Sequence, residues 1–453
     1  MRIMKSCLGA LLAVWAMALV SCQKSNEPLA MIPADADVMA SINVVKIMEN
    51  AGCKADGNRI TLTDGAAAVV NWGKSQAPLL RGIMESGALD LEHVYMVGSS
   101  SGSPVFLTAV TDAGALEKIL TDNAFNSTES DSWAVWSKDG APSFLMGEAV
   151  VVVTDSRSDA AATAKAVNTL LKGASKKSVA DVEWRRECLG RDNAVNLLAE
   201  LDATGMPVDG TMSVGIKLDG AEASAEIARL DGEGKKMADA AGFMEYFRDV
   251  NTGMLKYLNG FDVAVAAFGV KGDFPWNKVA DMAGDADPRS RQVMALVLPY
   301  LQSLDGTLMI GAGPRRGLAS FMMSDASDFM EYWDVTVAVE LKEGDAQKYL
   351  AQLETLLKMN PLPGLSVRAE GNTLIATTGA GADGVPSVDA SVLKGQSNIL
   401  AVRLPKEGAV MTGLNAPFGV DFRCWADKDV TRATLRLTDT DKPLLETLLG
   451  QVM

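Results

Sequence analysis

The chain has 453 residues, of which 42 are Lys or Arg and 57 are Asp or Glu. Residues 1–21 hold two of the basic residues and none of the acidic ones, so the chain that follows them has a net charge of −17. We therefore expect no nucleic-acid partner, because phosphate binding requires clustered Lys and Arg. With 48% hydrophobic residues, the chain can build large cores, and its length predicts two or more domains.

The N-terminus follows the plan of a secretory signal. Arg2 and Lys5 precede an uncharged, mostly apolar run from Leu8 to Val20 that is too short to span a bilayer. The run ends in the lipobox Leu19-Val20-Ser21-Cys22, whose thiol accepts diacylglycerol before cleavage. We predict a signal peptide over 1–21, lipidation of Cys22 and a tether over 22–32, so that the chain is lipid-anchored in the cell envelope. No other stretch of about 20 apolar residues occurs, and the body is expected to be water-soluble.

The start of the mature chain resembles a known family. Residues 31–43 read Met-Ile-Pro-Ala-Asp-Ala-Asp-Val-Met-Ala-Ser-Ile-Asn, and a short helix is expected directly afterwards, over 47–52. This pattern behind a lipobox resembles the Bacteroidetes lipoproteins of domain-of-unknown-function family 4836. The resemblance implies the outer membrane of a Gram-negative bacterium, with the periplasmic or surface side left open. It carries over no catalytic residue.

The remaining chain repeats one order of elements. Residues 106–120 read as strand, turn and helix, and residues 335–350 do the same at an offset of 230. Alternating apolar residues flank the turns Asp219-Gly220 and Asp427-Lys428-Asp429, which predicts a hairpin at the end of each half. Such recurrence in the same order is typical of an internal duplication.

Two further matches pair Gly140 with Gly371 and Asp37 with Asp262. We therefore predict an α+β fold of two related halves, over 33–250 and 251–453. Each half is expected to be a mainly antiparallel sheet with helices packed on one face.

Two helices are well defined by their ends and by periodicity. One is predicted over 159–172, before Gly173, and the other over 345–359, before Pro361. An apolar stripe on the second helix predicts that it packs against the core; it consists of Tyr349, Leu350, Leu353, Leu356 and Leu357.

The residues that usually carry catalysis or bind metals are scarce. A Ser-His-Asp triad or a histidine metal site would have to use His93, the one histidine, which is interpreted as a structural residue at the start of a strand. Cys53, Cys188 and Cys424 are widely spaced; they exclude a disulfide-rich scaffold and leave one disulfide open. Cys424 is expected to be a small buried residue. We predict no catalytic residue, no cofactor and no metal ligand.

A few sites admit a second interpretation. The glycine-rich loop 311–317 could bind an anion, but a hairpin turn after a strand over 308–310 is favoured. Asp305 and Glu331 could form a carboxylate pair for hydrolysis, and the cluster Asp281, Asp285 and Asp287 is interpreted as a solvated loop rather than a calcium site. Trp133 and Trp136 are expected to pack in a hairpin, although exposure of one of them would suit ligand stacking.

These observations favour a non-catalytic envelope lipoprotein that binds or scaffolds another component, either an envelope protein or a glycan. The alternative is a carboxylate-dependent hydrolase that acts on glycan or peptide.

Overall fold

The computed structural model divides the chain into two compact units. Unit 1 comprises Met1–Met237 together with Asp441–Met453, and unit 2 comprises Ala238–Thr440. The expected boundary at 250/251 therefore lies inside unit 2. The C-terminal residues belong to unit 1, because the last helix packs against the first helices of that unit. The structure describes residues 28–72, 76–98, 103–147, 149–153, 159–172, 177–203, 209–237, 244–258, 263–280, 298–314, 333–360, 364–378, 388, 390–404, 406, 418–427 and 429–451.

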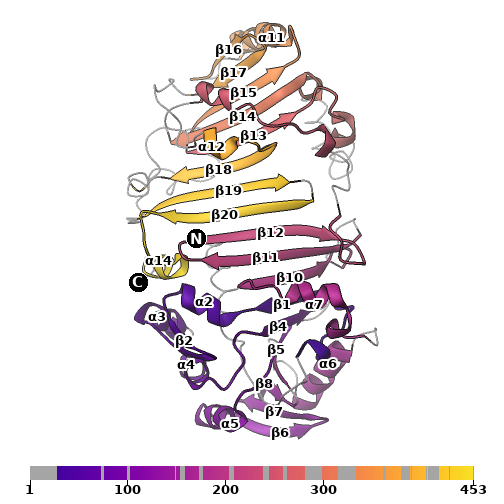
Figure 1. Ribbon diagram of the computed structural model, residues 1–453, viewed down its shortest axis with the longest axis vertical. Coiled ribbons are helices and arrows are strands. Elements are labelled where there is room, and N and C mark those ends of the chain that lie inside the picture. Colours follow the sequence, from indigo (N-terminus) through magenta and orange to yellow (C-terminus); the bar gives the residue numbers. More distant parts are fainter. Residues whose placement is uncertain are drawn as a thin grey trace. The chain divides into compact units, whose positions relative to one another are not determined.

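The described strands of unit 1 pair antiparallel in the order β12-β11-β10-β1-β4-β5-β9-β8-β7-β6 (Figure 1). Their bounds are β1 (Val38–Ile42), β4 (Val94–Gly98), β5 (Val105–Thr108), β6 (Asn126–Ser130), β7 (Trp133–Lys138), β8 (Ala141–Met146), β9 (Val150–Val153), β10 (Val195–Glu200), β11 (Thr211–Asp219) and β12 (Glu222–Leu230). A separate hairpin joins β2 (Lys54–Asp56) to β3 (Arg59–Thr61). The helices are η1 (Pro28–Met31), α2 (Val44–Asn50), α3 (Asp64–Trp72), α4 (Ala77–Ser86), α5 (Ala113–Asp122), α6 (Ala160–Lys172), η3 (Val179–Asp181), α7 (Glu183–Leu189) and α14 (Leu444–Leu449).

Helices cover both faces of the central strands in unit 1, not the single face expected. Ile42 and Phe106 belong to a core that also contains residues of α2, α3, α4 and α5. On the opposite face, Ser41 donates a hydrogen bond to the carbonyl of Leu189 in α7, and Trp133 Nε1 donates to Asn168 of α6 at 2.7 Å. Strands β5 and β9 are almost entirely apolar for this reason, because neither face meets water.

The described strands of unit 2 pair antiparallel in the order β20-β19-β18-β13-β14-β15-β17-β16 (Figure 1). Their bounds are β13 (Ala264–Val270), β14 (Leu304–Pro314), β15 (Trp333–Leu341), β16 (Ser366–Glu370), β17 (Thr373–Thr377), β18 (Asn398–Leu404), β19 (Gly419–Asp427) and β20 (Val430–Thr438). Its helices include η4 (Met244–Tyr246), η5 (Thr252–Tyr257), α11 (Asp345–Met359) and α12 (Ala390–Leu393).

One face of the unit 2 sheet is a closed core. Val265, Ala267, Met309 and Ala401 are each at most 2% exposed and pack with residues of η5 and α12. A smaller core joins α11 to β15 and β17 around Tyr349. The α+β class, with mainly antiparallel strands, is confirmed by both units.

The two helices and two hairpins expected from local sequence signals are confirmed. Asp159 caps α6 by accepting from the backbone N–H of Ala162 at 2.8 Å, and α11 spans the predicted residues 345–359. Strand pairing places Asp219 opposite Glu222 and Asp427 opposite Val430 at the two hairpin ends. Gly220 adopts a φ of +53°, the conformation for which its hairpin turn favours glycine.

The apolar stripe on α11 is only partly used. Tyr349 is buried, whereas Leu350, Leu353 and Leu357 are half-buried and Leu356 is 47% exposed. The N-terminal half of the helix therefore packs against the sheet, and the C-terminal half leaves part of its stripe in solvent.

Candidate functional site

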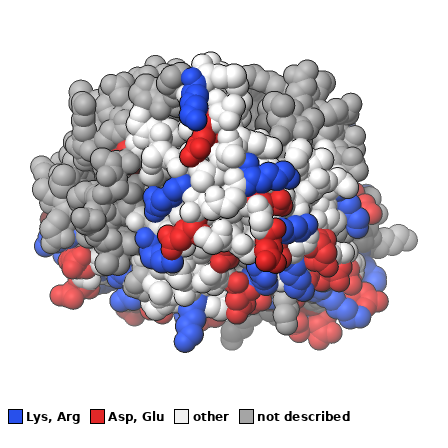
Figure 2. All heavy atoms as spheres, turned by 90° about the horizontal axis from the view of Figure 1, so that it is seen from above, with Lys and Arg blue, Asp and Glu red and all other residues white. Residues whose placement is uncertain are grey.

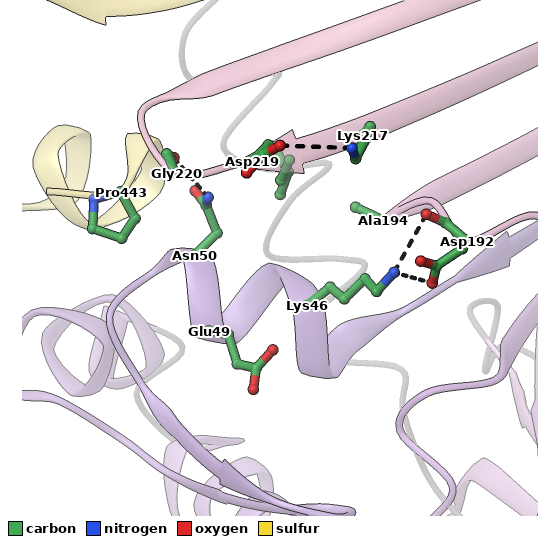
Figure 3. Close-up of a pocket in the computed structure, with 10 residues that line it drawn as sticks. Lys46, Glu49, Asn50, Asp192, Ala194, Lys217, Asp219, Gly220 and Pro443 are labelled. Atoms are coloured by element: carbon green, nitrogen blue, oxygen red, sulfur yellow. Dashed lines mark hydrogen bonds and ion pairs between the residues drawn. The ribbon is translucent and has the colours of Figure 1, made fainter.

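A polar pocket of about 330 Å³ lies in unit 1 between helix α2 and the hairpin of β11 and β12 (Figure 3). It is lined by Lys46, Glu49, Asn50, Asp192, Ala194, Lys217, Leu218, Asp219, Gly220 and Pro443. Helix α2 begins at Asn43, whose side chain accepts from the backbone N–H of Lys46 at 2.8 Å. Lys46, Glu49 and Asn50 follow at helical spacing, so one side of α2 carries all three.

Four of the five charged side chains that line the pocket form two ion pairs. The Lys46 ammonium forms an ion pair with the Asp192 carboxylate and also donates to the Asp192 carbonyl at 3.3 Å. The hydrogen bond from Lys46 to the carboxylate, together with the positive charge of Lys46, lowers the pKa of Asp192. Lys217 lies 3.6 Å from Asp219. In Figure 3, Lys46 reaches toward Asp192, whereas Glu49 leaves the helix in another direction.

Asn50 forms the inner wall of the pocket and is itself buried. Its Nδ2 donates to the carbonyl of Gly220 at 2.9 Å, and its Oδ1 accepts from the backbone N–H of Leu445 at 2.9 Å. The amide therefore ties α2 to the hairpin turn and to the first turn of α14. Both of its polar ends are occupied, so it is not available to a ligand.

This arrangement suits polar contact better than proton transfer. A general acid that works near neutral pH needs a raised carboxyl pKa, and the environment of Asp192 lowers it. The other described carboxyl groups with a shifted pKa, those of Asp181, Asp231 and Glu370, are also lowered, each mainly by hydrogen bonds to the carboxylate. The pocket is thus polar and charged, and the pKa of its Asp192 carboxyl is shifted away from the range that a general acid needs.

A second candidate is an apolar sheet face in unit 2. Strand register places Ile310, Ala266, Leu400 and Cys424 side by side across β14, β13, β18 and β19. Phe268 lies on the same face, two residues along β13. We call these five residues the open row. Leu400 is 42% exposed, Phe268 is 40% exposed, and the other three are half-buried.

The open row breaks the usual pattern of a sheet with one face toward solvent. Antiparallel strands of this kind alternate between apolar residues toward the core and polar residues toward water. Here the buried face, with Val265 and Ala267, and the open row are both apolar. Apolar side chains that are neighbours on a surface commonly mark an interaction site.

The residues considered for chemistry from the sequence are dispersed. The His93 ring lies just before β4 and pairs with Asp90 at 3.0 Å, with more than half of the side chain exposed. Asp305 pairs with Arg248 at 3.4 Å, while Glu331, Asp281, Asp285 and Asp287 lie outside the described residues. The carboxylate pair and the aspartate cluster therefore stay untested hypotheses.

The three cysteines of the body are free thiols. Cys53 and Cys188 are buried, and burial is the main reason that the pKa of Cys53 is raised. Cys424 was expected to be fully buried, but it is half-buried on the open row. The disulfide left open by the sequence is absent among them.

One local expectation needs correction, and another, the hairpin packing of Trp133 and Trp136, is confirmed. Gly311 to Pro314 do not form a hairpin turn, because they continue β14 and pair with residues of β15 up to Trp333; residues 315–317 lie outside the described part. Trp133 and Trp136 are both buried, so neither is an exposed stacking surface. The pocket and the open row were missed by sequence reasoning, because each is assembled from segments that are distant along the chain.

The predicted lipidation site, Cys22, lies outside the described residues, as does the signal peptide. Within the described part of the chain, no helix has the length and apolarity needed to cross a membrane, and no group of three or more His, Cys, Asp or Glu side chains is arranged to hold a metal ion. Comparison of the chain with protein-family models, with curated proteins and with solved structures finds no match.

Proposed function

We propose that the chain is a non-catalytic binding protein of the cell envelope, held at the membrane by lipid on Cys22, and that it binds an apolar surface of its partner through the open row of unit 2. The observation that carries the proposal is the exposure of Phe268 and Leu400 on neighbouring strands of a mostly apolar sheet face. Burying the exposed part of one leucine contributes about 1 kcal/mol, so several such side chains together can support a stable complex.

Charge does not favour a polyanionic partner. The chain has a formal net charge of −15, and on the surface in Figure 2 acidic and basic side chains are interspersed among uncharged ones. A partner that relied on phosphate contacts would need a basic patch. An envelope protein or a glycan with an apolar face is therefore the proposed class, and no nucleic acid is included.

Binding can be tested with matched variants of the processed lipoprotein. Leu400→Asp places a charge on the open row, whereas Leu356→Asp places one on α11 at a leucine of similar exposure. Native envelope extract is passed over each protein, and captured components are quantified by mass spectrometry. A component that the wild type and Leu356→Asp retain, and that Leu400→Asp loses at least about tenfold, supports the proposal. Equal capture by all three proteins, or no capture by the wild type, refutes it.

The lipid anchor has its own test. Cys22→Ala removes the thiol that accepts lipid, so the chain is expected to leave the membrane fraction or to accumulate with its signal peptide attached. Fractionation and intact mass measure both outcomes. A variant that is cut before residue 22 and stays at the membrane would show that the anchor lies elsewhere.

We also propose that the two units descend from one duplicated half, consistent with the resemblance to family 4836. The proposal is supported by the spatial order of the strands, which is the same in both units. In unit 1 the order is β12-β11-β10-β1-β4-β5-β9-β8, and in unit 2 the corresponding order is β20-β19-β18-β13-β14-β15-β17-β16. Helices α5 and α11 follow matching strands.

Register supports the duplication residue by residue. Val38 pairs with both Gly98 and Ala199, and Ala264 pairs with both Ala312 and Val402. The match of residue 140 with residue 371 fails, because unit 1 has two extra strands, β6 and β7, at that point. A superposition of the matched strands in which the core side chains do not coincide would overturn the common origin.

A further inference from the structure

The C-terminal segment 441–451 returns to unit 1 after the chain has completed unit 2. Its helix α14 packs against α2 and α3. Leu444 and Thr447 are buried in this contact, and Leu445 lies against the main core of the unit. A helix of six residues has little stability alone, so tertiary contacts hold it in place.

Three hydrogen bonds hold the start of α14 in place, two of them made by α14 itself and one that positions Asn50. The backbone N–H of Leu444 donates to the carbonyl of Gly220 at 2.8 Å, and the backbone N–H of Leu445 donates to Asn50 Oδ1 at 2.9 Å. Asn50 Nδ2 donates to the same Gly220 carbonyl at 2.9 Å. One buried amide thus joins three segments that are distant along the chain.

The same helix covers the turn at Gly52 and Cys53. An atom added at the Cβ position of Gly52, where φ is +82°, would lie 2.9 Å from the side chain of Glu446. Glu446 is held in turn by Lys442 at 2.9 Å. Cys53, the residue after Gly52, is buried in the main core of unit 1; burial raises the pKa of its thiol, and the nearby Glu446 carboxylate adds to that shift.

We infer that residues 441–451 act as a latch, meaning that unit 1 is fully packed only when this segment is in place. Release of α14 is then a local opening that exposes Cys53 while the rest of unit 1 stays folded. The physical basis is that the helix is short and that its hydrogen bonds to the rest of unit 1 depend on Asn50 and Gly220, which places it among the less stable parts of the unit. Residues 441–451 are therefore needed to complete the packing of unit 1, and a chain truncated before residue 441 leaves Cys53 accessible to solvent.

The test measures thiol labelling in the full, processed chain under native conditions, with each cysteine followed by peptide mass spectrometry. Asn50→Ala removes two of the three hydrogen bonds, so labelling of Cys53 is expected to accelerate about 10- to 100-fold. Cys188 is the internal reference, because it is buried in the same unit on α7, which is not one of the helices that α14 packs against. Its labelling rate should stay within about threefold of wild type.

A matched control is Asn123→Ala. The Asn123 amide donates to the Ile119 carbonyl at the end of α5, so its loss weakens unit 1 without touching α14. The latch is refuted if Asn50→Ala leaves Cys53 protected, if Cys53 and Cys188 accelerate together, or if Asn123→Ala has the same effect on Cys53. A chain that ends at residue 440 provides a second readout: loss of protection at Cys53 is expected, and full protection overturns the proposal.

Discussion

Asn196 provides a strict test of how unit 1 is held together. It lies on β10, is only 4% exposed, and faces Ser41 of β1 in the strand register. Its Nδ2 donates to Ser41 Oγ at 3.1 Å, to the Leu189 carbonyl at 3.2 Å and to the Arg191 carbonyl at 2.9 Å. The amide therefore connects two central strands to the end of helix α7.

Asn196→Ala removes these hydrogen bonds and leaves a small cavity. The Leu189 carbonyl still accepts from Ser41, and the Arg191 carbonyl still accepts from the backbone N–H of Asn193, so neither is left without a donor. At about 1 kcal/mol for each buried hydrogen bond, we expect the free energy of unfolding of unit 1 to fall by about 2–3 kcal/mol. Asn196→Asp should cost more, because a carboxylate cannot donate to the oxygen atoms that surround it.

Urea titration followed by tryptophan fluorescence measures these changes. Asn126→Ala, at an exposed position on the edge strand β6, is the control and should change stability by less than about 0.5 kcal/mol. If Asn196→Ala costs no more than this control, or if Asn196→Asp is the milder of the two Asn196 variants, the hydrogen bonds of Asn196 are not what stabilises the contact with α7.

Trp133→Phe should lower stability by about 1 kcal/mol more than Trp136→Phe, because Trp133 Nε1 has a hydrogen-bond partner and the buried Trp136 Nε1 has none in the described structure; equal losses in paired urea titrations contradict this. The pKa of Asp231 is lowered by backbone N–H donors of the following turn. The ionised Asp231 carboxylate therefore contributes its full stabilisation above the unfolded-state pKa of about 3.9, and this stabilisation is lost as pH falls through the lower folded-state pKa. An NMR titration of the Asp231 carboxyl that gives a midpoint at or above about 3.9 argues against this prediction. Gly306→Ala should destabilise unit 2 by about 2–4 kcal/mol in the same urea titration, because Gly306 has a φ of +149° and an added methyl group would clash with the Glu340 side chain. A neutral result would mean that β14 relaxes freely at the irregular register between Leu304 and Leu308.

Local sequence signals were sufficient where the controlling interaction is itself local. The start of α6 depends on Asp159, which caps the helix through the backbone N–H of Ala162 three residues later. The hairpin at Gly220 depends on a turn that favours a positive φ. The order of strands in unit 2 could be anticipated for the same reason, since most neighbours there are also close in sequence.

Interactions between distant segments were not predictable in the same way. Helices were expected on one face of the sheet, but Ser41 and Met39 of β1 are buried on the other face, because α7 returns from about 150 residues later to cover them. Gly311 looked like part of a turn because its neighbours are small, although pairing with β15 keeps it in a strand. The pocket at Lys46 is lined by segments that are distant along the chain, and the contact of Asn50 with Leu445 of α14 joins residues 395 positions apart.

By itself, the sequence determined the composition and the periodic elements, and it predicted an export signal with a lipid acceptor, because each of these depends on residues within one or two turns of chain. Only the tertiary structure decided which faces those elements bury, where unit 1 ends, and that Phe268 and Leu400 lie exposed side by side. The reason is that burial is a property of packing between segments: the same apolar alternation in two strands is covered by helices in unit 1 and left half-open in unit 2.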